Sequence, residues 1–350
     1  MRYDPFARGQ FPVGVRTIEV TREARTLPIE VWYPATDDYA GRDVDPGTRD
    51  TFELIPGLPP GWQDAVRDAT SRPGRHPFVA FSHGYGGHRR QSTFLCTHLA
   101  SHGYVVAAVD HTGNTVLDVM QVLLGVMNGV PIPDPGDVLR EFIAARPADV
   151  SFMIDHVLEG AGKVGADPER VGMAGHSFGG WTTLATAARD PRVRAAFPLA
   201  PAGGASPLPA KALQEGLDLR WQRDVPTLFV VADRDTLLPL RGMHEIYERL
   251  SSTKRMVVLK NADHMHFCDR VEEVHEMFRL MPQDPVFAPI QGSVPPITEL
   301  CPGEHALTAI RALGLAHMDA HLRGDERAAA FLGGDVRGVL AERGVAVDVV

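Results

Sequence analysis

The residues best suited to chemistry form the segment 175–180, which reads Gly-His-Ser-Phe-Gly-Gly. This segment follows a short apolar run at 171–174 and precedes a stretch of helical spacing that begins near Phe178. A serine on such a tight strand-to-helix turn projects its hydroxyl above the sheet, and the crowded turn needs glycines around it. The pattern predicts that Ser177 is a nucleophile. The alternative is an ordinary serine in a glycine-rich turn.

A second glycine-rich turn, Ser-His-Gly-Tyr-Gly-Gly at 82–87, follows the apolar run 76–81. Acyl transfer needs backbone N–H groups that hold the charged oxygen of the tetrahedral intermediate. Around a serine turn of this kind, one N–H comes from the loop after the third strand and another from the residue after the nucleophile. We therefore expect Tyr85 and Phe178 to donate these hydrogen bonds. His83 is expected to brace the loop rather than to act as a base.

A nucleophilic serine needs a base, and the base needs an acid that orients it. In this arrangement the chain order is serine, then acid, then histidine. The apolar run 227–232 ends in Asp-Arg-Asp at 233–235. Asp235 is predicted to be the acid, because it lies further out in the loop. Asp233 is the alternative; its other expected roles are in the turn itself or in a pair with Arg234.

Two histidines follow the apolar run 255–259. His264 comes first after the turn and is predicted to be the base, with His266 as the alternative. Together with Asp269 these histidines could also suggest a metal site. However, the spacing misses the HxHxDH pattern of dinuclear hydrolases. We therefore expect neither a metal nor an organic cofactor.

The elements that must position these residues alternate between apolar runs of strand length and segments of helical spacing. Continuous apolar runs are typical of parallel strands that helices cover on both faces, and the alternation is typical of α/β domains. We therefore predict the α/β-hydrolase fold, with a mostly parallel central sheet and helices on both faces. The strand candidates are 27–33, which alternates in polarity like an edge strand, 76–81, 104–109, 171–174, 193–197, 227–232 and 255–259; the helix candidates are 91–101, 147–159, 178–189 and 243–250.

Two stretches interrupt this alternation within what we predict to be one domain over residues 1–350. Residues 112–145 contain an apolar helix candidate and are expected to form a helical lid inserted in the domain, which could line an acyl pocket. The alternative is a buried helix. A stretch at 283–301 rich in proline and glycine leads into a helical block that includes 305–322. Residues 283–350 are therefore expected to form a C-terminal helical extension.

Composition limits the classes of partner. The chain has 350 residues, with 35 Lys and Arg against 44 Asp and Glu and no dense basic run, which argues against nucleic-acid binding. Its 3 cysteines lack the spacing of a disulfide framework or a zinc site. The N-terminal residues lack the apolar region of a signal peptide, and no uncharged apolar run could span a membrane. A cytoplasmic location is expected, and a homodimer is left open.

Three segments resemble the platelet-activating-factor acetylhydrolase family of the lipoprotein-associated type and its bacterial relatives. They are Phe-Ser-His-Gly-Tyr-Gly-Gly at 81–87, Leu-Ala-Ser-His-Gly-Tyr-Val-Val-Ala-Ala-Val-Asp-His at 99–111 and Gly-Met-Ala-Gly-His-Ser-Phe-Gly-Gly at 172–180. The histidine region, with Phe267 and Asp269 after His264, resembles the same family. The acid segment, Asp-Thr-x-x-Pro at 235–239, is more similar to that of cutinases and polyester hydrolases.

The resemblance covers about residues 27–269 and implies a carboxylester hydrolase with Ser177, Asp235 and His264 as its triad. Such an enzyme acts through an acyl-enzyme on small-molecule esters with short or medium acyl groups. A lipase, a phospholipase A2-like enzyme and a polyester hydrolase are the nearest alternatives. An amidase, a peroxidase-like enzyme and a carbon–carbon bond hydrolase share the triad. A non-catalytic binding protein of this fold would have a broken triad, whereas this sequence offers a full set in the required order.

Overall fold

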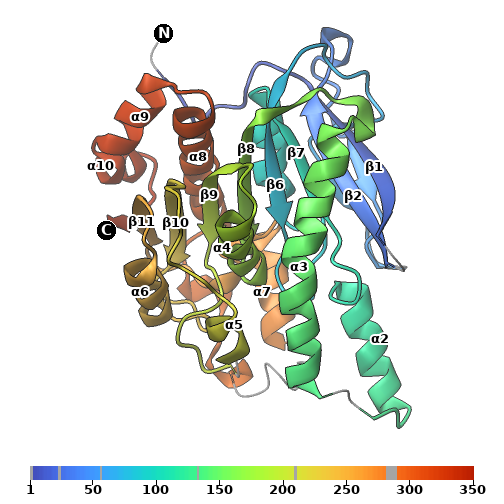
Figure 1. Ribbon diagram of the computed structural model, residues 1–350, viewed down its shortest axis with the longest axis vertical. Helices are drawn as coiled ribbons and strands as arrows, with labels where there is room; N and C mark the ends of the chain where they lie inside the picture. The colour runs from blue at the N-terminus through green and yellow to red at the C-terminus, as the bar shows by residue number, and fades with distance from the viewer. Residues whose placement is uncertain (1–2, 23–24, 56, 132–133, 209–210, 281–289) are drawn as a thin grey trace.

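The computed structural model describes residues 3–22, 25–55, 57–131, 134–208, 211–280 and 290–350. Over these residues, a large twisted sheet runs through the molecule (Figure 1). From one edge to the other its strands are β12 (Val347–Val349), β11 (Lys254–Leu259), β10 (Thr227–Ala232), β9 (Val193–Leu199), β8 (Ala166–His176), β6 (His76–Ser82), β7 (Val105–Val109), β2 (Arg25–Pro34), β1 (Val13–Arg22) and β5 (Val66–Arg67). A separate small hairpin pairs β3 (Asp50–Phe52) with β4 (Gly61–Gln63).

The centre of the sheet is parallel, as predicted. Strands β7, β6, β8, β9, β10 and β11 pair side by side in the same direction. Successive side chains along β6 enter opposite cores: Phe78 and Ala80 lie in one apolar cluster, and Val79 and Phe81 in the other. This is the reason why the central strands read as unbroken apolar runs.

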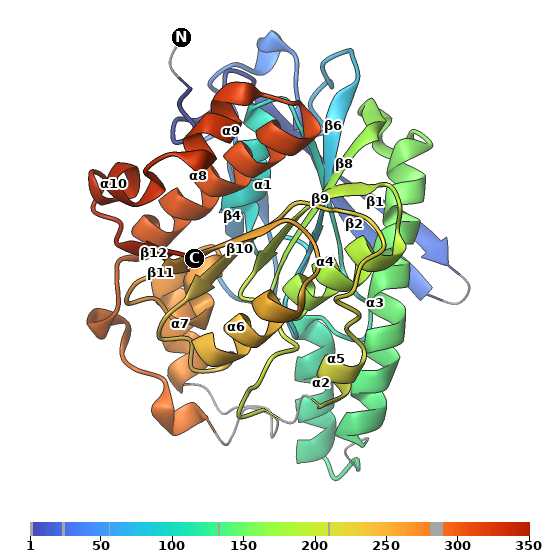
Figure 2. The ribbon, with the colours of Figure 1, turned by 60° about the vertical axis from the view of Figure 1, so that its left-hand side comes forward.

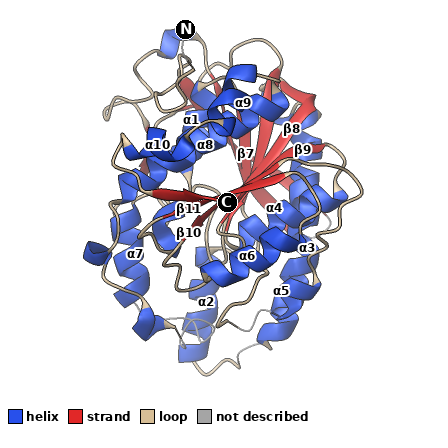
Figure 3. Cartoon of the chain, turned by 90° about the vertical axis from the view of Figure 1, so that its left-hand side faces the viewer, coloured by secondary structure: helices blue, strands red, loops and turns tan. Residues whose placement is uncertain are grey.

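Helices cover both faces of the sheet (Figures 2 and 3). One face packs against α3 (Pro135–Leu158), α4 (Phe178–Arg189), α5 (Lys211–Glu215) and α6 (Leu240–Arg249). The other face packs against α1 (Thr93–Ser101), α8 (Gly303–Leu322) and α10 (Val336–Ala341). Helix α9 (Glu326–Gly333) and helix α7 (Val271–Leu280) lie against α8. The architecture is therefore the predicted α/β fold.

The prediction of an edge strand at 27–33 is wrong, because β2 lies between β1 and β7. Its alternating polarity comes from Glu30, whose side chain is fully buried. The Glu30 carboxylate pairs with Arg67 at 2.8 Å and with Arg90 at 3.0 Å. A buried, paired glutamate and a solvent-facing glutamate give the same alternating pattern in the sequence.

The expected boundary of the insertion at residue 145 lies inside one helix. Residues 112–145 contain α2 (Val116–Met127) and the first half of α3. Helix α3 begins at Pro135, where the missing N–H costs nothing, and Asp134 caps it by accepting from the backbone N–H groups of Gly136 and Asp137. The helix then continues through Pro147, where the sequence analysis expected a helix to begin.

The C-terminal part is built into the core and is not wholly helical. Strand β12 joins the sheet antiparallel to β11, with Val347 opposite Leu259. Helix α8 places Ala309, Leu313 and Met318 in the apolar cluster that it shares with the sheet. The stretch 283–301 is rich in proline and glycine, and its residues 283–289 lie outside the described residues.

Candidate active site

The four elements that carry the predicted site residues end at the same edge of the sheet. Ser177 follows β8, Tyr85 follows β6, Asp235 follows β10 and His264 follows β11. Since these strands are parallel, their carboxyl ends meet at one edge, which is where ligands bind in open α/β sheets.

Ser177 occupies a strained turn between β8 and α4. Its φ of 61° lies in the left-handed region and its ψ is −118°, which is costly for a residue with a side chain. The backbone around it is held firmly: its N–H donates to Leu199 at 2.9 Å, and its carbonyl accepts from Trp181 and Ala202 at 3.0 Å each. The side chain is half-buried, so the hydroxyl sits at the surface of a rigid turn.

The glycines around Ser177 are required by close backbone packing. A Cβ on Gly179 would collide with the carbonyl oxygen of Ser82, and a Cβ on Gly175 would collide with the carbonyl oxygen of Gly179. These two positions therefore accept no side chain. The loop after β6 also lies against the nucleophile, because a Cβ on Gly84 would be 3.4 Å from the Cβ of Ser177.

The structure brings Asp235 and His264 together. The Nδ1 of His264 donates to Oδ2 of Asp235 at 2.8 Å, and both side chains are buried. The second oxygen of Asp235 accepts from the backbone N–H groups of Leu237 at 3.0 Å and Leu238 at 2.7 Å. Burial disfavours the charged imidazole, but the charge and hydrogen bond of Asp235 outweigh it and raise the pKa of His264 above its ordinary value.

Asp263 joins the acid loop to the histidine loop. Its Oδ1 accepts from the backbone N–H groups of Thr236 at 2.8 Å and His264 at 2.7 Å. The carboxylate is almost fully buried. No sequence motif points to Asp263, because one of its two partners, Thr236, lies in another loop.

The alternative acid, Asp233, and the alternative base, His266, have other partners. Asp233 accepts from the backbone N–H of Asn261 at 2.6 Å and pairs with Lys260 at 2.8 Å. His266 accepts at Nδ1 from the backbone N–H of Asp263 at 3.1 Å and donates at Nε2 to the carbonyl of Cys301 at 3.0 Å. Both residues therefore shape the turns after β10 and β11, and neither makes the Asp235–His264 contact.

The residue before the nucleophile connects Ser177 to the base. The ring of His176 stacks on Phe267, with 5.3 Å between ring centroids, and lies 4.5 Å from the ring of His264. Burial lowers the pKa of His176 well below its ordinary value. A neutral imidazole from the serine turn thus packs against the histidine loop.

Gln91 is a bridge that the sequence analysis missed. Its Oε1 accepts from the backbone N–H of Gly84 at 3.0 Å, and its Nε2 contacts Nδ1 of His176 at 2.8 Å. Because an N–H can only donate, the amide oxygen must face Gly84, and the amide nitrogen therefore donates to His176. The proton of His176 then resides on Nε2. No spacing pattern in the sequence points to this residue.

The predicted oxyanion donors lie in two elements beside Ser177. Phe178 is the first residue of α4, and its N–H is among those that have no carbonyl partner within a helix. Tyr85 follows Gly84 in the loop that touches Ser177. His83 braces this loop, as expected: its Nδ1 donates to the carbonyl of Gly84 at 2.7 Å, and its Nε2 accepts from the backbone N–H of His111 at 3.1 Å.

The residues considered for a metal site have separate partners. Asp269 accepts from the N–H and hydroxyl of Thr93, at 2.7 Å each, and from the N–H of Phe94 at 3.0 Å, so it caps α1. Within the described residues, no group of three His, Cys, Asp or Glu side chains is placed to hold a metal ion. Likewise, no helix in that part of the chain is both long and apolar enough to cross a bilayer.

Comparisons with known proteins agree with this fold. A family model described as platelet-activating factor acetylhydrolase, isoform II, matches residues 61–121, and a PET hydrolase-like model matches residues 159–279. The first match includes Tyr85, and the second includes Ser177, Asp235 and His264. The resemblance expected from the sequence is therefore confirmed.

Several curated relatives are ester hydrolases by name. Cutinase est1 of Thermobifida alba is 32% identical over 194 residues, which cover 53% of this chain and 52% of the cutinase. Cutinase 2 of Thermobifida cellulosilytica is 30% identical over 195 residues, covering 55% of this chain and 61% of that protein. Bis(hydroxyethyl) terephthalate hydrolase of Streptomyces coelicolor is 31% identical over 191 residues, covering 53% and 49%. The matched region thus spans about half the length of these relatives.

A solved structure shares the fold over nearly the whole chain. The ferulic acid esterase from Streptomyces cinnamoneus superimposes with a TM-score of 0.61 and 24% sequence identity. The superposition covers 91% of this chain and 92% of the esterase. The α/β-hydrolase fold is therefore established for this protein.

Proposed function

We propose that this protein is a serine carboxylester hydrolase that cleaves short or medium acyl esters through an acyl-enzyme. The observation that carries the proposal is the buried hydrogen bond of 2.8 Å between Asp235 and His264, at the sheet edge where Ser177 occupies its strained turn. The relatives named as cutinases and as a terephthalate ester hydrolase support the same reaction.

In the first half of the reaction, His264 removes the proton of Ser177 as Oγ attacks the ester carbonyl. Asp235 holds the imidazole in the tautomer that has its proton on Nδ1, and it stabilises the imidazolium that forms. The backbone N–H groups of Tyr85 and Phe178 hold the oxyanion of the tetrahedral intermediate. One such donor contributes about 3 kcal/mol to transition-state stabilisation.

The first intermediate then collapses: its bond to the alcohol oxygen breaks, the imidazolium of His264 protonates the leaving alcohol, and the acyl group stays on Ser177. Water then enters, His264 takes its proton, and the hydroxide attacks the acyl group on Ser177. The second tetrahedral intermediate collapses as its bond to Ser177 Oγ breaks, and the imidazolium of His264 returns the proton to Oγ, which releases the acid and restores the serine. Every proton in the cycle moves through His264, so the chain's own residues are sufficient for the reaction.

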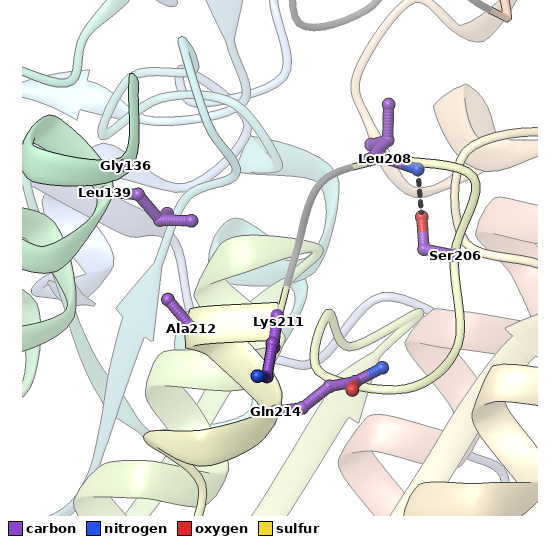
Figure 4. A pocket seen from close by; sticks show the side chains of 7 residues that line it. All are labelled: Gly136, Leu139, Ser206, Leu208, Lys211, Ala212 and Gln214. Carbon is purple, nitrogen blue, oxygen red and sulfur yellow. Dashed lines mark hydrogen bonds between the residues drawn. The ribbon is translucent and has the colours of Figure 1, made fainter. Parts of the chain in front are cut away.

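A cavity of about 450 Å³ lies between the start of α3 and the segment around α5 (Figure 4). The side chains around it include Leu139 and Leu208. Ser206, on its wall, donates to the carbonyl of Leu237 at 2.8 Å, and the N–H of Leu237 donates to Asp235. These hydrogen bonds place the cavity beside the acid loop, but the described residues that line it include none of the triad and neither predicted oxyanion donor.

The proposal is tested with p-nitrophenyl esters from acetyl to palmitoyl, beside p-nitroanilides. We expect hydrolysis of the short and medium esters, and loss of this activity in Ser177→Ala but not in Ser71→Ala, whose hydroxyl only bonds the carbonyl of Lys163. A fluorophosphonate should label Ser177, as located by mass spectrometry. Equal activity of the wild type and Ser177→Ala would overturn the assignment. Preferred cleavage of the anilides would instead indicate an amidase.

A second candidate is a hydrolase of polymeric or aggregated esters. The observation that favours it is helix α2, on which Leu124 and Met127 are 55% and 82% exposed. Activity on a polyester film or an emulsion that exceeds activity on soluble esters would support it. A cytoplasmic location and a homodimer stay predictions, to be checked by cell fractionation and light scattering.

A further inference from the structure

We propose that Arg146 is a positioning residue that orients the two backbone donors of the oxyanion hole, the N–H groups of Tyr85 and Phe178. The inference rests on the proposed function, because it assigns a role in the same site. Arg146 lies in the middle of α3 and is fully buried. No sequence pattern singles it out, and it does not belong to the triad.

The guanidinium of Arg146 connects three separate parts of the chain. It donates to the carbonyl oxygen of His83, in the loop after β6, and to Oδ1 of Asn114 at 2.6 Å. Its carbon atom lies over the ring of Phe178, 4.4 Å from the ring centroid. One side chain of α3 therefore contacts both the loop of Tyr85 and the first residue of α4.

The contact with His83 fixes one peptide group from both ends. The carbonyl of His83 and the N–H of Gly84 belong to the same planar unit. Arg146 holds the carbonyl, and Gln91 accepts from the N–H at 3.0 Å. The carbonyl of the next peptide is held by the imidazole of His83 at 2.7 Å, and that peptide carries the N–H of Tyr85. The direction of the first donor is thus determined by this chain of contacts.

The contact of Arg146 with the ring of Phe178 affects the second donor, the backbone N–H of Phe178. A cation over an aromatic face is attracted by the ring, the more strongly when both are removed from water. The exposed fraction of Phe178 is 3% and that of Arg146 is 0%. The ring of Phe178 is therefore held in place, and with it the backbone N–H at the start of α4. In addition, a positive charge behind both donors favours the oxyanion.

Burying this charge is expensive, which argues that the charge itself has a use. A buried ion loses several kcal/mol of hydration unless an opposite charge compensates for it. The hydrogen-bond partners named above are neutral. Asp149, one turn further along α3, offsets part of this charge, but it is itself paired with Arg25 at 2.9 Å and Arg22 at 3.7 Å. Burial accordingly lowers the pKa of Arg146 to about 9. An apolar side chain would pack here at lower cost.

A buried set of three side chains, Ser82, His111 and Asp149, lies next to Arg146. Ser82 Oγ lies 2.9 Å from Nε2 of His111, and Nδ1 of His111 lies 3.2 Å from Asp149. Ser82 Oγ also accepts from Arg146 at 3.4 Å. The exposed fraction of each of these three side chains is 0 or 1%, so no substrate can reach this serine. The set resembles a triad in composition, but we assign it to bracing the oxyanion loop.

The experiment compares Arg146→Met and Arg146→Lys with Arg140→Met, a control on the exposed face of the same helix whose side chain is 64% exposed. With p-nitrophenyl butyrate, we expect Arg146→Met to lower kcat by about 10-fold to 100-fold, less than the 10²–10³ lost with a whole oxyanion donor, and to change KM by less than about twofold. Affinity for a trifluoromethyl ketone should fall by the same factor as kcat. Arg146→Lys should restore part of both, and Arg140→Met should match the wild type.

A purely structural role predicts a different result. A lower melting temperature with unchanged kcat below that temperature would overturn the proposal, as would equal losses in kcat and 1/KM. If Arg146→Met does not fold, Arg146→Gln and Arg146→Lys carry the same comparison.

A second readout does not depend on turnover. Hydrogen–deuterium exchange of the amides at 83–87 should be faster in the Arg146 variants than in Arg140→Met. Inactive wild-type enzyme would refute the esterase assignment, whereas unchanged exchange at 83–87 would refute the role of Arg146, so the two failures are distinguishable.

Discussion

The loops that carry Asp235 and His264 and the helix α2 differ in how they are held. Asp235 and His264 are 5% and 3% exposed, and Asp263 ties their two loops together. Helix α2, which the structure describes in full, has no buried side chain. It extends from the end of the molecule beside the start of α3 (Figure 1). Its links to the oxyanion loop include the hydrogen bond from the N–H of Val116 to the carbonyl of Gly87 at 3.0 Å.

This difference separates two tasks. Groups that transfer protons must keep their distances within a few tenths of an ångström, and burial with full hydrogen bonding achieves that. An exposed apolar helix has few constraints on its side chains, so it can adapt to different substrates. The rigid loops would set the rate of the reaction, and α2 would set the range of esters. Substitutions in the rigid loops or on α2 change one side of this division at a time.

The largest effect is expected from the acid. Asp235→Asn should lower kcat by about 10⁴-fold, because the amide no longer stabilises the imidazolium of His264. Asp233→Asn, in the same loop, should change kcat by less than about twofold, since Asp233 contacts Asn261 and Lys260. Steady-state kinetics on one ester compares them. A crippled Asp233→Asn beside an active Asp235→Asn would exchange the two assignments.

Substitution of the two candidate bases, His264 and His266, should affect kcat just as unequally. His264→Ala should abolish measurable turnover, whereas His266→Ala should keep kcat within about tenfold and lower the melting temperature, because His266 joins two backbone segments. Kinetics together with thermal unfolding separates the two outcomes. Comparable losses of kcat in both variants would show that His266 takes part in the chemistry.

The pH profile follows from the raised pKa of His264. Only the neutral imidazole accepts the proton of Ser177, so kcat/KM should fall about tenfold per pH unit below that pKa. Because the pKa lies above the ordinary value of 6.5, the fall should begin above pH 6.5. The residual activity of Asp235→Asn should have its midpoint at lower pH, since the carboxylate that raises the pKa is gone. A midpoint unmoved by this change would contradict the assigned cause.

A smaller effect is expected from the bridge between the oxyanion loop and the serine turn. Gln91→Leu removes both the acceptor for Gly84 and the donor for His176. We expect a loss of about tenfold in kcat with little change in KM, because the loop keeps its other contacts. Gln10→Leu, at an exposed position, is the control. A change confined to KM would instead place Gln91 in substrate binding.

The smallest effect is expected on α2. Replacing Leu124 and Met127 together by serine should leave hydrolysis of the acetyl ester within about twofold and lower that of the palmitoyl ester several-fold, since a longer acyl chain has more apolar surface to bury against this helix. Leu58→Ser, at a position 53% exposed in the N-terminal part, is the matched control. Equal losses on both esters would mean that α2 positions the oxyanion loop rather than the acyl chain.

Sequence patterns predicted the parts of the molecule that depend on local order. Helix α4 and strand β10 have the bounds that were expected, because each is a single apolar or periodic run with clear ends. The contact between Asp235 and His264 was also anticipated, since chain order and strand ends determine it. Strand β2 was misplaced because Glu30 finds its partners in Arg67 and Arg90, far along the chain.

The residues that support the site were beyond such patterns. Gln91, Asp263 and Arg146 act through partners on other elements, and their sequence neighbours give no hint of this. The continuation of α3 through Pro147 was missed because a proline normally ends or kinks a helix. In each case a tertiary contact outweighs the local preference, which only the folded arrangement can show.

Strand β12 joins the sheet late, because its residues are among the last of this sequence to be synthesised. It completes the sheet edge beside β11, the strand that leads to His264, and the N–H of Val350 donates to the carbonyl of Met256 at 2.8 Å. Ribosomes deliver the chain from its N-terminus, so residues 347–349 emerge after all the triad residues. A nascent chain that still lacks them has an open strand edge next to the histidine loop, which is a site for pairing with other chains. Protection of this strand edge would therefore arrive only after the triad residues have been synthesised.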